Sequence, residues 1–128
     1  MNENSKESVK EKLRVPGVAA VVDLVVVLVF VAIGRRNHDE EATLSGYVGT
    51  VAPFFMALAA TWFVSRAWRA PVAARTGYTV WIGTVVMGML LRKFVFADGT
   101  ATAFVIVATV FLGAGINLWR LAVRPRNV

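Results

Sequence analysis

Four long apolar stretches constrain this chain more than any other feature of its sequence. Residues 15–34 contain one ionised side chain, Asp23, whereas residues 44–65 and 99–119 contain none. Residues 77–91 are also uncharged and lead into Arg92 and Lys93. A helix needs roughly 20 apolar residues to cross about 30 Å of hydrocarbon. The pattern therefore predicts an integral membrane protein with four transmembrane helices.

The composition agrees with a chain that is embedded in a membrane. Hydrophobic residues make up 57% of it and charged residues 17%, against about 25% charged residues in a typical soluble domain. The formal net charge is +6, but the basic residues flank the apolar stretches and form no single patch. We therefore expect membrane lipids and no nucleic acid as partners. With no cysteine and one histidine, the sequence indicates no metal site and no cofactor.

Short connections separate the apolar stretches and define the domain organisation. We expect a polar tail over residues 1–14, either solvated or forming a frayed surface helix, and a short basic tail over residues 123–128. Between them, residues 15–122 form one transmembrane domain with spans at about 15–35, 44–66, 76–96 and 99–121. Because short connections place consecutive helices side by side and antiparallel, the predicted fold is an all-α, up-down-up-down four-helix bundle.

Lysine and arginine residues predict the orientation of the bundle. The side with both tails and the second connection carries ten of them: Lys6, Lys10, Lys12, Arg14, Arg66, Arg69, Arg75, Arg120, Arg124 and Arg126. The opposite side carries four: Arg35, Arg36, Arg92 and Lys93. Since the cytoplasmic side of a membrane protein is enriched in lysine and arginine, both termini are expected in the cytoplasm.

Small and polar residues within the spans predict where the helices touch. Apolar side chains gain little by leaving lipid for one another, so membrane helices associate through close approach and polar contacts. On this ground we expect helix packing at Gly34, Pro53, Gly88, Gly113 and Asn117. A cavity lined by such residues is the alternative.

Asp23 is the strongest candidate for chemistry, because a carboxylate at the centre of a span costs about 2.5–3.5 kcal/mol on insertion scales. The rise of a helix places Asp23 about 12 Å inside the membrane, level with Thr84, and Arg92 about 12 Å further out. The candidate intramembrane site is therefore Asp23, Thr84 and Trp81, in which Asp23 hydrogen-bonds a hydroxyl, an indole N–H or water. Two roles stay open: a polar clamp between helices, and the handling of a proton, a cation or a ligand head group.

A second candidate site lies at the opposite membrane face and consists of Arg35, His38 and Arg92. The planar fork of an arginine suits a carboxylate or a phosphate, and a histidine can change its charge near neutral pH. Helix capping, contact with lipid phosphates and extension of the arginines toward the interface are the structural alternatives.

The order of these residues resembles a small bacterial membrane family catalogued as domain of unknown function 3054. The similarity runs from about residue 16 to residue 120 and rests on Asp23, Phe30, Gly34-Arg35-x-x-His38, Pro53-Phe54, Arg69-x-Pro71, Arg75-x-Gly77 and Gly88-x-x-x-Arg92. The family often has serine before the histidine, where this chain has Asn37. The resemblance implies a four-span protein of the bacterial cytoplasmic membrane. It supplies no established activity, substrate or cofactor.

Three classes of function stay open at this point. We favour an accessory, assembly or scaffolding module, either as a homo-oligomer or within a larger membrane complex, because a short-looped chain of this size has little room for an active site of its own. The first alternative is a transporter-like protein for a proton, an ion or a small solute, which would use Asp23 and the outer Arg/His cluster. The second is a membrane enzyme for a lipid-phase substrate, although the sequence contains no familiar nucleophile or nucleotide motif.

Overall fold

The computed structural model describes residues 3–37, 44–95 and 102–123, with the backbone alone for residues 35–37 and 44–46. All regular secondary structure in these ranges is helical, which confirms the all-α part of the predicted fold for this part of the chain. The elements are α1 (Glu3–Leu13), α2 (Pro16–Asn37), α3 (Leu44–Ser65), the short 3-10 helix η1 (Ala67–Arg69), α4 (Ala74–Phe94) and α5 (Thr102–Val123). Helices α2 to α5 lie in the four apolar stretches, and α1 lies in the polar tail.

Three of these helices are long and apolar enough to cross a membrane. They contain the segments Pro16–Gly34 in α2, Tyr47–Ser65 in α3 and Thr102–Val123 in α5. Helix α4 is more polar, because it carries Arg75 near its start and Arg92 and Lys93 in its last turn. The described part of the chain therefore has the character of a membrane protein with three clearly apolar helices.

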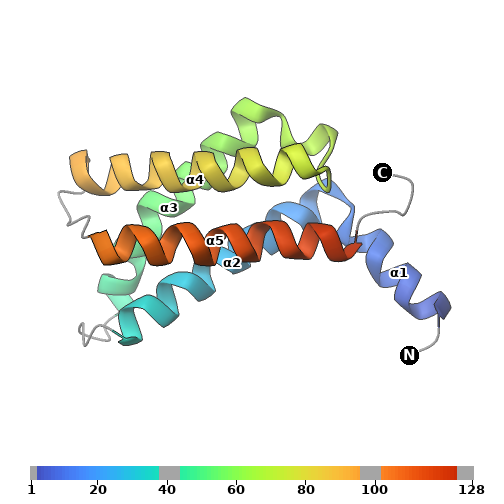
Figure 1. The fold of residues 1–128 in the computed structure, drawn as a ribbon, viewed down its shortest axis with the longest axis horizontal. Helices are drawn as coiled ribbons and strands as arrows, with labels where there is room; N and C mark the ends of the chain where they lie inside the picture. The colour runs from blue at the N-terminus through green and yellow to red at the C-terminus, as the bar shows by residue number, and fades with distance from the viewer. Residues whose placement is uncertain (1–2, 38–43, 96–101, 124–128) are drawn as a thin grey trace.

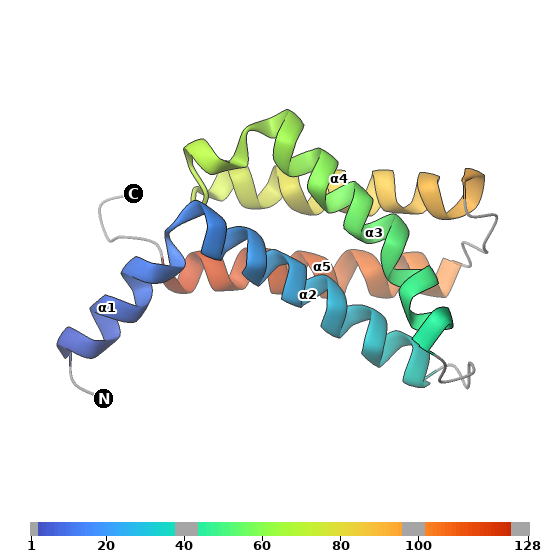
Figure 2. The ribbon, with the colours of Figure 1, turned by 180° about the vertical axis from the view of Figure 1, so that it is seen from behind.

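The four long helices pack in two layers, one formed by α2 and α3 and the other by α4 and α5 (Figures 1 and 2). Consecutive helices run in opposite directions, as the colour gradient of Figure 1 shows. Helix α4 packs against both α3 and α5, and α2 contacts both α3 and α5. Helix α1 projects from this body and contains no buried residue.

Two long-range hydrogen bonds hold one end of the molecule together. Arg14 Nε, between α1 and α2, donates to the carbonyl oxygen of Val123 at the end of α5, at 2.7 Å. Arg120 Nε, in the last turn of α5, donates to the carbonyl oxygen of Pro71 in the α3–α4 connection, also at 2.7 Å. The start of α2, the α3–α4 connection and the end of α5 therefore lie at the same end (Figure 1).

A group of phenylalanine rings joins three of the helices away from that end. The Phe30 ring centroid lies 5.7 Å from those of Phe54 and Phe104 and 5.8 Å from that of Phe111. Phe54 is completely buried and lies directly on α4, since a Cβ atom added at Gly88 would be 2.7 Å from Phe54 Cδ1. The lack of a side chain at Gly88 thus lets α3 and α4 approach closely.

The other residues expected at helix contacts fall into two groups. A Cβ atom at Gly113 would lie 2.7 Å from the Trp81 ring, and Pro53 is buried inside α3. Asn117 lies against α4, since a Cβ atom added at Gly77 would clash with Asn117 Oδ1. At Gly34 an added Cβ would meet no heavy atom of the described residues within 4 Å. The structure therefore shows no close helix approach at Gly34, which lies in the last turns of α2.

Candidate functional site

Asp23 lies at the centre of a buried polar cluster that joins three helices. Its Oδ1 accepts hydrogen bonds from Arg120 Nη1 at 2.8 Å and from Trp119 Nε1 at 2.9 Å. Its Oδ2 accepts from Arg120 Nη2 at 2.7 Å and from Trp62 Nε1 at 2.8 Å. The side chains of Asp23 and Arg120 are both 0% exposed. We call these four residues the Asp23 cluster; its core is a bidentate ion pair, the strongest form of arginine–carboxylate contact.

Two of the three N–H donors of Arg120 that do not bind Asp23 are engaged as well. Besides the bond from Nε to Pro71, Nη1 donates a second bond to the Ile116 carbonyl at 2.9 Å. The guanidinium carbon lies 4.7 Å from the centroid of the Trp119 ring, so the cation also contacts an aromatic face. The charge of Arg120 is therefore compensated on several sides despite its complete burial.

Helix geometry explains why Asp23 and Arg120 meet. The Cα–Cβ bonds of a helix tilt toward its N-terminus. At the end where Arg14 binds Val123, α2 begins and α5 finishes, so Asp23 leans toward this end and Arg120 leans away from it. Their Cα atoms differ in depth by only about four residues, or roughly 6 Å at the rise of a helix, and the long arginine side chain spans this difference.

This arrangement includes one of the partners expected for Asp23 and adds another that was not expected. The anticipated indole N–H is present twice, from Trp62 and Trp119, but Arg120 was expected among the cations at the membrane surface. The sequence did not predict this pair because the rise per residue locates only the Arg120 Cα, near the end of its span. The direction and the length of the side chain, which bring the guanidinium to Asp23, do not enter that estimate. The sequence did contain a signal for this pair: an acidic residue, Asp23, near the start of the first expected span and a basic residue, Arg120, at the end of the fourth. When the first and the fourth span are antiparallel, these two positions lie at the same end of the bundle.

Trp81 and Thr84, the other two members of the predicted intramembrane site, form no hydrogen bond with Asp23. Trp81 Nε1 donates to the Thr109 carbonyl at 2.8 Å and so connects α4 with α5. Thr84 is completely buried, and its Oγ1 has no hydrogen-bond partner among the described residues. A joint functional role for the three residues stays a prediction.

The predicted outer cluster falls largely outside the described residues. His38 is not among them, and only the backbone of Arg35 is described. Arg92, in the last turn of α4, holds its guanidinium carbon 4.5 Å from the centroid of the Phe104 ring at the start of α5. This contact is a cation–π interaction between two helices, and binding of an anion by the outer cluster stays a prediction.

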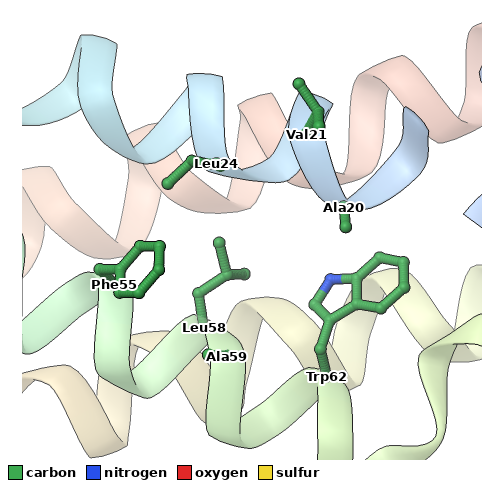
Figure 3. A pocket seen from close by; sticks show the side chains of 7 residues that line it. All are labelled: Ala20, Val21, Leu24, Phe55, Leu58, Ala59 and Trp62. Carbon is green, nitrogen blue, oxygen red and sulfur yellow. The ribbon is translucent and has the colours of Figure 1, made fainter. Parts of the chain in front are cut away.

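An apolar groove of about 210 Å³ lies between α2 and α3 beside the Asp23 cluster (Figure 3). Trp62 belongs to both, because its ring lines the groove while its Nε1 donates to Asp23. The groove can hold hydrocarbon, but its lining supplies no carboxylate, hydroxyl or amine that could act on a substrate. The lining residues are Ala20, Val21, Leu24, Phe55, Leu58, Ala59 and Trp62.

Replacing Trp62 with phenylalanine tests the contribution of one indole donor to the Asp23 cluster. Trp62→Phe removes a hydrogen bond to a charged acceptor and should lower the free energy of unfolding by about 1.5–3 kcal/mol. Trp81→Phe removes a bond to a neutral carbonyl and should cost about 0.5–1.5 kcal/mol. Trp68→Phe, at an exposed ring, should change it by less than about 0.5 kcal/mol. Equilibrium unfolding in mixed micelles gives the three values, and a Trp62 effect no larger than that of Trp68 would contradict this description of the cluster.

Comparison with known proteins agrees with the resemblance noted in the sequence. A family model described as "Protein of unknown function (DUF3054)" matches residues 20–123, a range that contains all four residues of the Asp23 cluster. Neither a curated protein nor a solved structure matches the chain. Because the family match covers most of the 128 residues, the chain belongs to the DUF3054 family of proteins of unknown function.

Proposed function

We propose that this protein is a non-catalytic membrane module, an accessory, assembly or scaffolding subunit in which the Asp23 cluster acts as a structural clamp. The observation that supports this proposal most strongly is that each carboxylate oxygen of Asp23 already accepts two hydrogen bonds. An ionised carboxylate offers about four acceptor positions, so none is left for a transported proton or cation. Asp23 is also the one acidic residue within the four apolar stretches.

The proposal includes α4 as a fourth membrane crossing. Its 21 residues extend for about 31 Å at the helical rise, which matches the roughly 30 Å thickness of the hydrocarbon core. It packs against α3 and α5, and its cations lie near its ends. Its polar residues Thr76, in the first turn, and Thr84, near the middle, are buried. An even number of crossings also agrees with the Arg14–Val123 bond, which joins the start of α2 to the end of α5.

The outward face of α2 supports a role in contact with lipids or other helices. Val21, Val25, Val29 and Ile33 recur every four residues and are each more than two-fifths exposed, so they form one apolar stripe on the surface. Within this proposal the stripe faces lipid, a second copy of the chain or a helix of a larger membrane complex in the bacterial cytoplasmic membrane. If the protein were an enzyme, the groove between α2 and α3 would have room for a lipid-phase substrate, but its lining residues supply no reactive group.

Single cysteines test the number of crossings and the orientation, since the chain contains no cysteine of its own. A membrane-impermeant maleimide applied to intact cells should label Thr43→Cys and should label Glu7→Cys and Asn127→Cys only after the membrane is opened. This result follows from four crossings with both termini in the cytoplasm, as the excess of lysine and arginine on that side predicts. Labelling of Glu7→Cys and Asn127→Cys from opposite sides would exclude four crossings.

Flux measurements in proteoliposomes test the non-transporting role. The purified protein should produce no more proton or potassium flux than empty liposomes, because Asp23 has no acceptor position to offer. A pH-sensitive dye inside the vesicles, with and without an imposed membrane potential, reports the flux. The proposal is wrong if the wild-type protein conducts and Asp23→Asn stops the flux while its helical circular dichroism and unfolding temperature stay unchanged.

A further inference from the structure

Three arginines surround one open hollow at the α3–α4 connection. Arg66, Arg69 and Arg75 line this hollow of about 460 Å³, and all three side chains are exposed. No carboxylate in the described part of the chain forms an ion pair with any of them. Unlike Arg120, these cations therefore have no anionic protein partner there, and the hollow concentrates their positive charge. The remaining lining residues are Ser65, Ala70 and Thr76.

The hydrogen-bonding groups of the hollow suit a ligand that only accepts hydrogen bonds. The hydroxyl of Ser65 already donates to the Thr61 carbonyl at 2.6 Å, and that of Thr76 donates to the Ala70 carbonyl at 2.6 Å. The donors that remain are the guanidinium groups and the first backbone N–H groups of α4, whose N-cap residue Ala73 forms no side-chain cap. The N–H groups at the start of a helix favour an anion.

The backbone at Arg66 has an unusual conformation. Its φ of 54° and ψ of 48° are left-handed, and it has the one positive φ among the described residues that are not glycine. This conformation ends α3 and turns the chain into η1, so that both Arg66 and Arg69 reach the hollow. A left-handed arginine is retained at an energetic cost, in a position where glycine would be the ordinary choice.

The surroundings of the hollow place it at the level of lipid head groups. The apolar segment Tyr47–Ser65 ends immediately before Arg66. A second hollow shares Arg66 and Arg69 with the first and is also lined by Phe63 and Trp68, whose ring centroids are 6.1 Å apart. Phe63 is 74% exposed and Trp68 is 43% exposed. Apolar rings beside forked cations are the groups that fit the boundary between acyl chains and phosphates.

We propose that Arg66, Arg69 and Arg75 form a binding site for the phosphate group of an anionic membrane lipid. The guanidinium forks bind the phosphate oxygens in a bidentate manner, and Phe63 and Trp68 contact the upper part of the acyl chains. The proposal goes beyond the module function, and it depends on α3 crossing the membrane but not on the total number of spans. A soluble phosphate shares the same chemistry, and the experiment separates the two sources.

Native mass spectrometry of the full-length protein in a neutral detergent measures the binding. The probes are phosphatidylglycerol, phosphatidylcholine and inorganic phosphate at matched concentrations. The triple variant Arg66→Gln, Arg69→Gln and Arg75→Gln should bind phosphatidylglycerol at least about tenfold more weakly than the wild type, through loss of several charge-assisted bonds. The matched control, Lys6→Gln, Lys10→Gln and Lys12→Gln, removes the same charge from α1 and should retain binding. Circular dichroism checks that both variants fold.

Three other outcomes of this experiment would overturn the proposal. Equal losses in the two triple variants would overturn the proposal in favour of a diffuse charge effect. Equal affinity of the wild type for phosphatidylglycerol and phosphatidylcholine would also overturn it. Binding of inorganic phosphate as tightly as phosphatidylglycerol, with the same dependence on the three arginines, would overturn the lipid as the source and assign the site to a soluble phosphate.

Discussion

The ion pair between Asp23 and Arg120 is the interaction on which the rest of this structure depends. Removing two charges from water costs several kcal/mol per ion, and their attraction offsets this cost only when hydrogen bonds satisfy the remaining polar positions. Here the bidentate contact and the indoles of Trp62 and Trp119 fill the four acceptor positions of Asp23. Two backbone carbonyls bring the number of bonded N–H donors of Arg120 to four of five. Because apolar surfaces give membrane helices little reason to choose one neighbour over another, such a cluster fixes which helix faces meet.

The cluster also connects the interior to the surface of the molecule. Arg120 binds the carbonyl of Pro71 and therefore holds the α3–α4 connection. Arg69 in η1 and Arg75 at the start of α4 line the open hollow on either side of this connection. Arg14 binds the last described residue of α5 at the same end. Away from this polar end, the helices are joined by the rings around Phe30 and by the close approach at Gly88. One end of the protein is thus held mainly by the charged cluster. The remainder is held by packing together with single hydrogen bonds from Trp81 to the Thr109 carbonyl and from Tyr47 to the Leu28 carbonyl.

Part of this architecture could be predicted from the sequence. The apolar stretches locate α2 to α5, because the length and polarity of a span are properties of a continuous segment. The importance of Asp23 was also visible, since a carboxylate in an apolar stretch needs compensation. The partners of Asp23 were not visible in the sequence. Arg120 and Trp119 are residue types that commonly occur at the end of a span, and nothing in the sequence distinguishes Trp62 from the other apolar residues of its span. Partners contributed by other helices depend on rotation and tilt, which neither hydropathy nor spacing specifies. For the same reason Thr84, although its predicted depth equals that of Asp23, forms no hydrogen bond with it, and neither does Trp81.

A double-mutant cycle on Asp23 and Arg120 tests the central claim most directly. Asp23→Asn and Arg120→Met each leave one polar partner buried without its counterpart, so each should lower the free energy of unfolding by about 3–5 kcal/mol. The double variant removes both charges and should be much more stable than the sum of the two losses implies, with a coupling energy of about 2 kcal/mol or more. Losses that add to within about 0.5 kcal/mol, in variants that still fold, would show that the two residues do not form the clamp described here.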